Sequence, residues 1–406
     1  MPRPGRARLF VLGILVLVAL ALFPDAFLRG RVFYYRDVHL QWVGQMEVLV
    51  RTLAAGSWPV WNPYASFGQP LLANPNYEVY YPPTLLNLVM APWTYYRLFV
   101  FLHLVVAGLG TYALGRRLGL SRMVAALTGI AWMASGPLVS LVSLWNHLAA
   151  AAWMPWSAWA GHRAATRPTL AAGVLWGAVM AAPVLAGSPE MALFAGVFGL
   201  VFALGAARGT GGAQRLARAL ATAGLVALAL SAAQWMPSLE LARRSRRADL
   251  PARQRDFWSV PPVDLLQCVL PALLDELPLQ PRVRAVLYES REPFLRSLYL
   301  GLSTVALVAA AGATRRRAAL ALAALAIGMA AFALGRHSPV AALMETIVPP
   351  LRGLRFPAKA MVPASLAWAL LAGIGLQAWV SARSRRHEAV VRIVGTVMAA
   401  FGLGAA

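Results

Sequence analysis

The feature that most constrains this chain is a series of long apolar runs separated by polar junctions. A helix that crosses a bilayer needs about 20 mostly apolar residues, because the hydrocarbon core is about 30 Å thick. We expect spans at Leu9–Phe23, Tyr96–Leu114, Met123–Leu144, Leu148–Ala160, Leu170–Ala186, Met191–Ala207, Ala219–Trp235, Leu298–Ala313, Ala318–Leu334, Met361–Val380 and Ala389–Ala406. The weakest, Leu148–Ala160, fits a re-entrant or a longer segment equally well. The sequence therefore predicts an all-α polytopic membrane protein of about 11 spans, forming one integral membrane domain over residues 1–406.

Composition agrees with this class and excludes others. Only 13% of the residues are charged, against about 25% in a soluble domain. The net charge of +22 comes almost wholly from arginine, and Lys359 is the single lysine. These arginines lie in short runs between apolar segments rather than on one face, so no nucleic-acid partner is expected. One cysteine, Cys268, excludes an internal disulfide and a cysteine metal cluster.

The arginine runs predict the topology, because cytoplasmic junctions are enriched in arginine and lysine. With a cytoplasmic N-terminus and an uncleaved first helix, the inner junctions hold Arg3/Arg6/Arg8, Arg116/Arg117/Arg122, Arg163/Arg167, Arg208/Arg215/Arg218, Arg315/Arg316/Arg317 and Arg383/Arg385/Arg386. Two junctions between them, at Asn146-His147 and at Gly187–Glu190, have none. The long extracytoplasmic loops are then 24–95, 236–297 and 335–360.

The first of these loops opens with Asp37, which precedes a helical pattern. Apolar residues recur at helical spacing from Trp42 to Leu53, and Gly56 fits a helix end, which predicts an amphipathic helix at the membrane interface. Asp37 is therefore either the N-cap of that helix, or a general base or metal-binding carboxylate at the membrane surface. An N-cap position would itself aim the carboxylate away from the helix, so the two roles are compatible.

Aromatic and amide side chains follow in the same loop. Indole and phenol rings suit the apolar faces of sugars and also suit a lipid interface. The Asn-Pro pairs are equally consistent with turns. The candidate substrate-binding residues of this loop are Gln41, Trp61, Asn62, Asn74, Glu78 and Tyr81.

Polar residues at two arginine-free junctions are further candidates. Asn146 and His147 lie between two apolar runs, and Glu190 follows Gly187-Ser188-Pro189. An ionisable residue near a span is costly and is by default a functional candidate. The structural alternatives are an interfacial imidazole for His147 and N-capping of the next helix for Glu190.

The last outer loop carries a basic group, Arg352, Arg355 and Lys359, just before a span. Topology does not require positive charge on this side. A phosphate or pyrophosphate ligand would explain it, and so would anchoring of a helix end to lipid headgroups. Gly353 and Pro357 favour a turn rather than a helix here.

Several motifs together resemble the YfhO-type bacterial membrane proteins, within the GT-C glycosyltransferases. They are Asp37-x-His39-x-Gln41, Trp61-Asn62-Pro63, Gly68-x-Pro70-x-x-Ala73-Asn74, Pro82-x-x-Leu85, Gly187-x-Pro189-Glu190, Leu295–Gly301 and Leu354–Lys359. The resemblance implies a multi-pass enzyme of the bacterial inner (cytoplasmic) membrane. Such an enzyme moves a sugar from a polyprenyl-phosphate donor to an envelope glycan or protein acceptor on the outer face.

The resemblance also assigns roles to residues. Asp37 takes the place of the first-loop acidic residue, and Arg355 and Lys359 match the basic pair of the last outer loop. His39, two positions after Asp37, is a second candidate catalytic residue. The paired acid typical of GT-C enzymes is missing, because Tyr35 and His39 flank Asp37 at the two possible positions. A divalent metal is therefore possible rather than required. The alternatives are a lipid or polysaccharide transporter or flippase, and a non-catalytic protein of envelope assembly.

Overall fold

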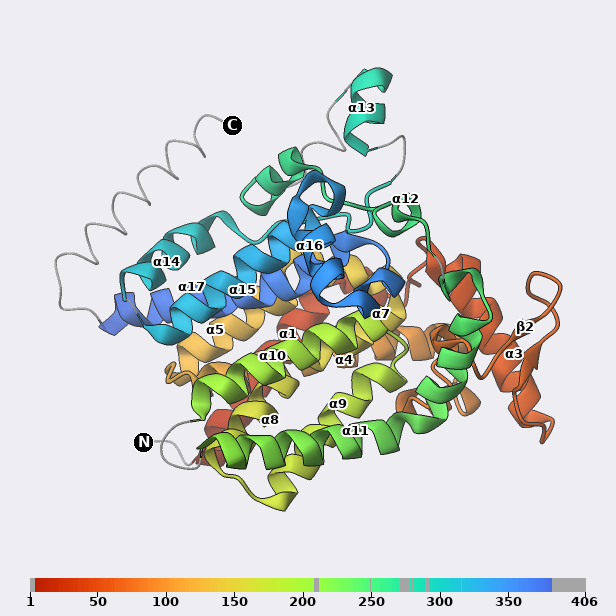
Figure 1. The fold of residues 1–406 in the computed structure, drawn as a ribbon, viewed down its shortest axis with the longest axis horizontal. Helices are drawn as coiled ribbons and strands as arrows, with labels where there is room; N and C mark the ends of the chain where they lie inside the picture. The colour runs from red at the N-terminus through yellow and green to blue at the C-terminus, as the bar shows by residue number, and fades with distance from the viewer. Residues whose placement is uncertain are drawn as a thin grey trace. The chain divides into compact units, whose positions relative to one another are not determined.

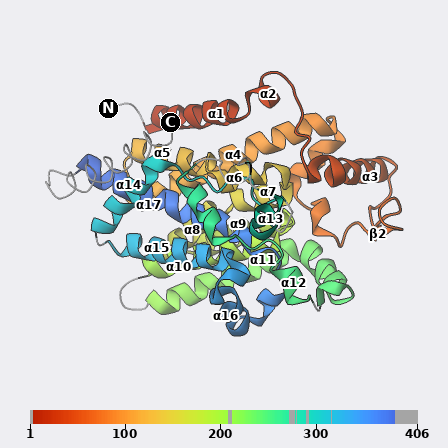
Figure 2. The same cartoon turned by 90° about the horizontal axis from the view of Figure 1, so that it is seen from above.

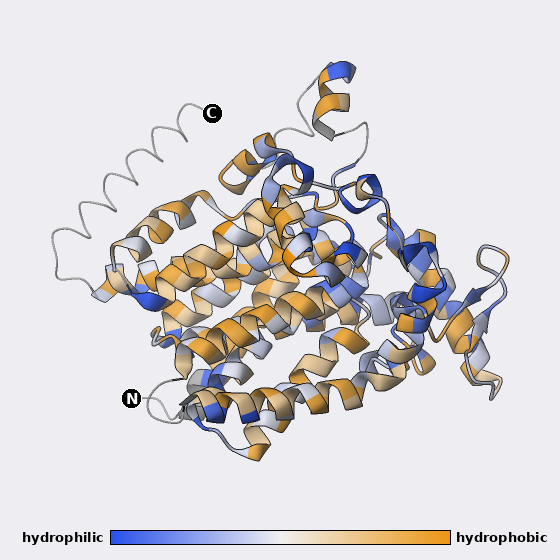
Figure 3. Cartoon of the chain, in the orientation of Figure 1, coloured by the Kyte–Doolittle hydropathy of each residue, from blue (hydrophilic) through white to orange (hydrophobic). Residues whose placement is uncertain are grey.

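The computed structural model describes residues 4–207, 212–248, 250–270, 278, 280–288, 292–314 and 316–381. Among them, regular structure is helical except for one short antiparallel pair, β1 (Trp61–Asn62) and β2 (Gln69–Pro70), which confirms the all-α prediction. Figure 1 shows this arrangement, and Figure 3 shows hydrophobic residues running along most of the helices while hydrophilic residues gather on the connecting segments.

Four helical segments of the described residues are long and apolar enough to cross a membrane. They are α4 (Pro92–Arg117), α10 (Pro189–Ala206), α11 (Gly212–Arg243) and the segment Pro357–Ser381, which contains α17 (Met361–Ser381). A fifth forms if the bent pair Arg122–Met133 and Gly136–Ser143 counts as one span. The chain is thus compatible with a membrane protein.

The remaining predicted spans in the described residues correspond to shorter or broken helices. Four of these are α1 (Pro4–Leu22), α9 (Leu170–Leu185), α14 (Leu302–Ala313) and α15 (Arg317–Ala333). The predicted Leu148–Ala160 run is divided between α7 (Trp145–Ala152) and α8 (Met154–Thr166), with Pro155 at the start of α8. The bent pair consists of α5 (Arg122–Met133), α6 (Gly136–Ser140) and a 3-10 turn, Leu141–Ser143. The predicted span Ala389–Ala406 lies outside the described residues.

The chain divides into two compact units, residues 1–110 with 141–249 and residues 111–140 with 250–406. In the first unit, α8, α9, α10 and α11 pack together around small residues and Trp176. Glycines permit the close approach of these helices: a side chain at Gly199 would meet Ser157 of α8, and one at Gly177 would meet Val226 of α11. Small residues at helix contacts are what packing in a lipid environment favours.

The second unit is organised around α17, most of which is buried. It packs against α5, α14 and α15, and Gly373 and Gly375 leave room for α5 and α14 respectively. Three shorter helices belong to this unit: α12 (Ala252–Arg255), α13 (Pro281–Tyr288) and α16 (Pro339–Ile347). Short 3-10 helices connect them at Pro262–Cys268, Gly335–His337, Pro349–Gly353 and Pro357–Ala360. The last two contain Gly353 and Pro357, so short 3-10 helices lie where the sequence favoured a turn.

The first long loop is ordered and belongs to the first unit. It contains α2 (Pro24–Phe27), a π-helical turn Val38–Trp42, α3 (Val43–Ala54), the β1–β2 hairpin and two 3-10 helices, Pro75–Tyr77 and Pro82–Leu88. Trp42, Met46 and Leu49 are buried, and Gly56 ends α3 in a left-handed conformation, as the pattern predicted. Figures 1 and 2 both draw the hairpin at the far side of α3 from α4. The prediction that residues 236–297 form a loop needs one correction, because α11 continues through Pro237 to Arg243, and a 3-10 turn follows at Arg246–Ala248.

Candidate functional site

Asp37 occupies the N-cap position of the π-helical turn but makes no capping hydrogen bond with its side chain. Its half-buried carboxylate is therefore not used up by the helix start. Burial raises the pKa of Asp37, and the neighbouring Arg36 guanidinium lowers it in part. Arg36 itself has a left-handed backbone, with φ of 52°. Such strain in a residue with a side chain is common at functional sites.

The two other candidates near Asp37 have different surroundings. The imidazole of His39 stacks on Tyr34 at 4.1 Å between ring centroids, and its Nδ1 donates to the Tyr34 carbonyl at 3.1 Å. These contacts fix the ring and make Nδ1 the donor nitrogen toward the Tyr34 carbonyl. Gln41 is exposed to solvent. The structure therefore holds Asp37 and His39 in defined positions and leaves Gln41 at the surface.

The hairpin residues differ in exposure. Trp61 is 52% exposed, and its indole packs on Gly68, where an added side chain would come within 2.6 Å of the ring. Asn62 is buried, and its Nδ2 donates to the Tyr77 hydroxyl at 2.6 Å. Asn74 accepts from the backbone N–H of Asn76 and so caps the 3-10 helix Pro75–Tyr77. Asn62 and Asn74 thus have hydrogen-bond partners within the protein. The ring of Trp61 is held in place by Gly68 and is partly exposed to solvent.

The 3-10 helix Pro75–Tyr77 lies against two segments far away in the sequence. Nδ2 of Asn146 donates to Oδ1 of Asn76 at 3.0 Å and to the Gly187 carbonyl at 3.2 Å. Nε1 of Trp145 donates to the Asn76 carbonyl at 3.0 Å. Gly187 has φ of +77° and lies so close to the Pro75 carbonyl that no side chain would fit. Segments from three parts of the sequence therefore meet at Pro75 and Asn76, and one of them carries the candidate Asn146.

His147 and Glu190 belong to the same group. Nδ1 of His147 lies 2.7 Å from the Ser188 hydroxyl, which also accepts from the Met191 backbone N–H. Ser188 is therefore the N-cap of α10, so the structural alternative in which Glu190 caps this helix is wrong. Glu190 instead lies buried in the first turn, where a carboxylate is favoured by the helix dipole.

Glu78 and Tyr81 occupy the interior beside this group. Glu78 is buried in a left-handed backbone conformation, and burial raises its pKa well above the usual range. The Tyr81 hydroxyl accepts from Nε1 of Trp153 at 3.0 Å and lies 2.7 Å from Nε2 of His103. Nδ1 of His103 lies 2.7 Å from the Phe99 carbonyl, which can only accept, so Nε2 accepts from Tyr81.

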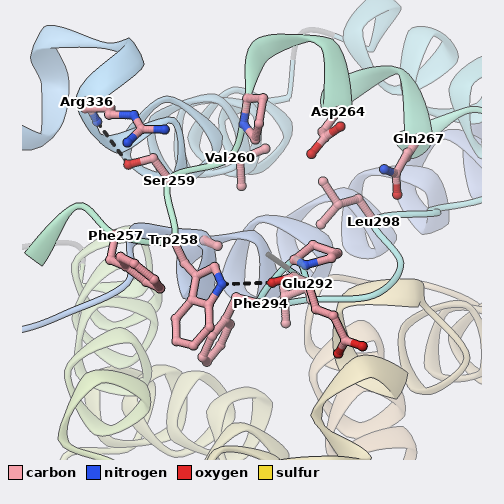
Figure 4. Close-up of a pocket in the computed structure, with 14 residues that line it drawn as sticks. Phe257, Trp258, Ser259, Val260, Asp264, Gln267, Glu292, Phe294, Leu298 and Arg336 are labelled. Carbon is pink, nitrogen blue, oxygen red and sulfur yellow. Dashed lines mark hydrogen bonds between the residues drawn. The ribbon is translucent and has the colours of Figure 1, made fainter. Parts of the chain in front are cut away.

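The second unit contains a pocket between segments that connect its helices (Figure 4). One wall is aromatic, with Trp258 packed against Phe294 at 5.3 Å between centroids. The opposite wall is the 3-10 helix Pro262–Cys268, from which Asp264 and Gln267 point toward the pocket although they are 4% and 6% exposed. Arg336, Glu292 and Ser259 complete the polar lining.

The predicted phosphate-binding residues lie partly behind the aromatic wall. Nζ of Lys359 lies 5.5 Å from the Phe294 ring centroid and 5.2 Å from that of Phe356. Cζ of Arg355 lies 4.7 Å from the same Phe356 ring. Lys359 is buried, Arg355 is half-buried and Arg352 is exposed. The structure therefore brings Arg355 and Lys359 to one ring next to the pocket.

Several residues of these sites were missed by sequence reasoning. His103 carried a readable signal, since it is an ionisable residue inside a predicted span. Trp153 and Ser188 carried none, because a tryptophan or a serine at a span end is common. Trp258, Asp264 and Phe294 lie in a segment that the sequence marked only as a polar loop.

The described residues contain no group of three or more His, Cys, Asp or Glu side chains suited to a metal ion. Comparison with the models of known protein families finds no match for this chain, and comparison with curated proteins finds no significant one.

Proposed function

We propose that this chain is a GT-C-type glycosyltransferase of the YfhO type. It transfers a sugar from a polyprenyl-phosphate donor to an envelope glycan or protein acceptor. In this proposal it is a multi-pass protein of the bacterial inner membrane with about 11 spans and a cytoplasmic N-terminus. The outer loops then face the lipid-linked donor.

One observation supports the proposal most directly: the pocket of the second unit combines an aromatic wall with buried polar groups and adjacent cations. Trp258 and Phe294 offer ring faces on which a sugar can stack. Asp264 and Gln267 offer hydrogen-bonding groups that face the pocket. Arg336 lines the pocket, and Lys359 lies against Phe294. A sugar joined to a phosphate needs these three kinds of contact together.

The reaction assigns a task to each group. The acceptor hydroxyl attacks the anomeric carbon, the bond from that carbon to the phosphate oxygen breaks, and polyprenyl phosphate leaves with the bonding electrons. Positive charge from Arg336, Arg355 and Lys359 stabilises the phosphate as it gains charge. The proton of the acceptor hydroxyl passes to a general base, and Asp37, whose carboxylate has no capping partner, is the candidate that the sequence offers for that role.

The experiment is transfer by the purified full-length protein in liposomes, with a panel of polyprenyl-phosphate sugars and release of polyprenyl phosphate as the signal. Lys359→Met keeps the length of the buried side chain and removes its charge, so we expect at least a tenfold loss of release. Arg244→Met is the matched control, because Arg244 pairs with Glu240 on an exposed surface. Equal activity of the two variants would show that Lys359 does not contribute to the site. If no donor gave release of polyprenyl phosphate, the proposed function would be rejected.

A further inference from the structure

Four polar residues recur at every third position after the 3-10 helix Pro75–Tyr77: Glu78, Tyr81, Thr84 and Asn87. Backbone hydrogen bonds run from Tyr81 N to Glu78 O at 3.0 Å and from Thr84 N to Tyr81 O at 2.9 Å. Thr84 and Asn87 lie in the 3-10 helix Pro82–Leu88, where side chains three positions apart lie above one another, and Glu78 and Tyr81 precede that helix. All four are buried, with exposures of 1%, 2%, 2% and 4% in chain order. We call them the polar stripe.

Three oxygen atoms of the polar stripe have no hydrogen-bond partner within the protein. They are Oε1 of Glu78, Oγ1 of Thr84 and Oδ1 of Asn87, and the hydroxyl of buried Tyr95 is a fourth atom of this kind. Thr84 and Glu78 both lie within interaction range of the Tyr95 hydroxyl. A buried polar atom without a partner costs about 1–3 kcal/mol. The hydroxyls of Thr84 and Tyr95 can offset this cost by bonding each other, but Oε1 of Glu78 and Oδ1 of Asn87 have no such partner, which indicates a ligand.

The chemistry of these atoms restricts what that ligand can be. Nδ2 of Asn87 is already used, since it donates to the Thr84 carbonyl at 2.9 Å and approaches the Met46 sulfur at 3.8 Å. The remaining atoms are all oxygens: one carboxylate, one amide carbonyl and two hydroxyls. Hard metal cations are bound by such oxygen sets.

Charge balance selects the cation further. In the described part of the chain, no arginine or lysine forms an ion pair with Glu78. One carboxylate balances one positive charge, whereas a divalent ion would leave a surplus charge in a buried site, which is costly. We propose that Glu78, Thr84, Asn87 and Tyr95 bind a monovalent hard cation of the size of Na⁺. This inference is independent of the proposed glycosyl transfer.

A proton is the natural competitor for this site. Burial raises the pKa of Glu78 well above its usual range, so a proton neutralises the carboxyl group when no cation does. The groups that face Glu78 are the hydroxyls of Tyr81, Tyr95 and Tyr96, and Asp37 acts on Tyr96 as well. The cation therefore stabilises the fold more at high pH, where the proton is scarce.

The site joins three elements of the first unit. Thr84 and Asn87 belong to the 3-10 helix Pro82–Leu88, Tyr95 belongs to the first turn of α4, and Asn87 contacts Met46 of α3. Tyr95 also stacks on Trp42, with the two rings 6° from parallel. A bound cation would hold the 3-10 helix Pro82–Leu88 against α3 and α4.

The test measures thermal unfolding of the full-length protein in detergent by intrinsic tryptophan fluorescence. NaCl, KCl and choline chloride are added at equal ionic strength, with CaCl₂ and MgCl₂ as further arms, at pH 6 and pH 8.5. We expect a saturable rise in Tm with NaCl that choline chloride does not give and that is larger at pH 8.5. Equal effects of NaCl and choline chloride at both pH values would mean that water alone serves these oxygens, and a response to divalent ions alone would overturn the assignment.

Variants locate the effect. Glu78→Gln keeps the size of the side chain and removes its charge, so the response to Na⁺ should disappear. Thr84→Val removes one oxygen at constant shape and should weaken the apparent affinity at least tenfold, which also provides a test if the first variant does not fold. Glu47→Gln is the matched control, because Glu47 is an exposed acid of α3 paired with Arg51. An undiminished response in Thr84→Val would contradict the site.

Discussion

The side-chain amide of Asn146 donates to Oδ1 of Asn76 at 3.0 Å, and the two residues lie 70 positions apart. The same nitrogen atom donates to the Gly187 carbonyl. Asn146→Asp replaces this donor by an acceptor that faces two other oxygens. We expect a loss of about 1–3 kcal/mol in the free energy of unfolding, measured as a lower Tm in detergent. Gln41→Glu makes the same chemical change at an exposed position and should leave the Tm unchanged.

Gly187 offers a second test of this contact. Gly187→Ala adds a methyl group that meets the Pro75 carbonyl and also strains a backbone with φ of +77°. Gly56→Ala is the matched control, because Gly56 has φ of +72° and open space where the side chain would lie. Backbone strain of about 1 kcal/mol is common to both variants. Gly187→Ala should therefore lower the Tm more, and equal Tm values would mean that the contact with Pro75 contributes nothing.

Tyr81 and Tyr80 form another matched pair. Tyr81→Phe removes the hydroxyl that joins Trp153 to His103, so two buried ring nitrogens lose their partner. We expect a destabilisation of about 1–3 kcal/mol and a change in the fluorescence of Trp153. Tyr80→Phe makes the same change at the neighbouring, half-buried position. A similar loss of stability in both variants would show that the hydrogen bonds of the Tyr81 hydroxyl with Trp153 and His103 do not contribute to the free energy of unfolding.

Asp37 and Arg36 predict a pH dependence of the proposed transfer. A general base must be ionised, so activity should fall as the pH drops through the raised pKa of Asp37. Arg36 lowers that pKa in part, and Arg36→Gln removes this effect. The acid limb of the activity profile should then move to higher pH. Arg51→Gln, at an exposed arginine of α3, should leave the limb in place. If the acid limb moved equally in Arg36→Gln and Arg51→Gln, Asp37 would not be the general base.

The sequence allowed the helical class, the helix from Trp42 to Leu53 and its glycine end to be predicted, because apolar periodicity and helix ends are local properties. The number of spans was harder to predict, since α14 is only 12 residues long and the run after Met123 bends by 43°. Hydropathy counts apolar residues and does not register a break at Gly136-Pro137.

The site was predictable only in its parts. Asn146, His147 and Glu190 stood out because polar residues near spans are costly. The contact of Asn146 with Asn76, and that of His147 with Ser188, depend on the close approach of Gly187 to Pro75, a tertiary contact with no local pattern. The buried position of Lys359 was likewise unpredictable, because it arises from rings at Phe294 and Phe356 that only the fold brings together.

The length of α11 has a mechanical consequence. Its 32 residues extend about 48 Å, which exceeds a hydrocarbon core of about 30 Å. Near the C-terminal end of α11, Gln234 and Ser238 donate hydrogen bonds to the carbonyls of Leu72 and Ala73, just before the 3-10 helix Pro75–Tyr77. Since a helix in a thinner bilayer tilts, the lipid thickness would set the height of this loop. The acyl chain length of the surrounding lipid would thus become a variable that acts on Asn76 and its neighbours through the C-terminal end of α11.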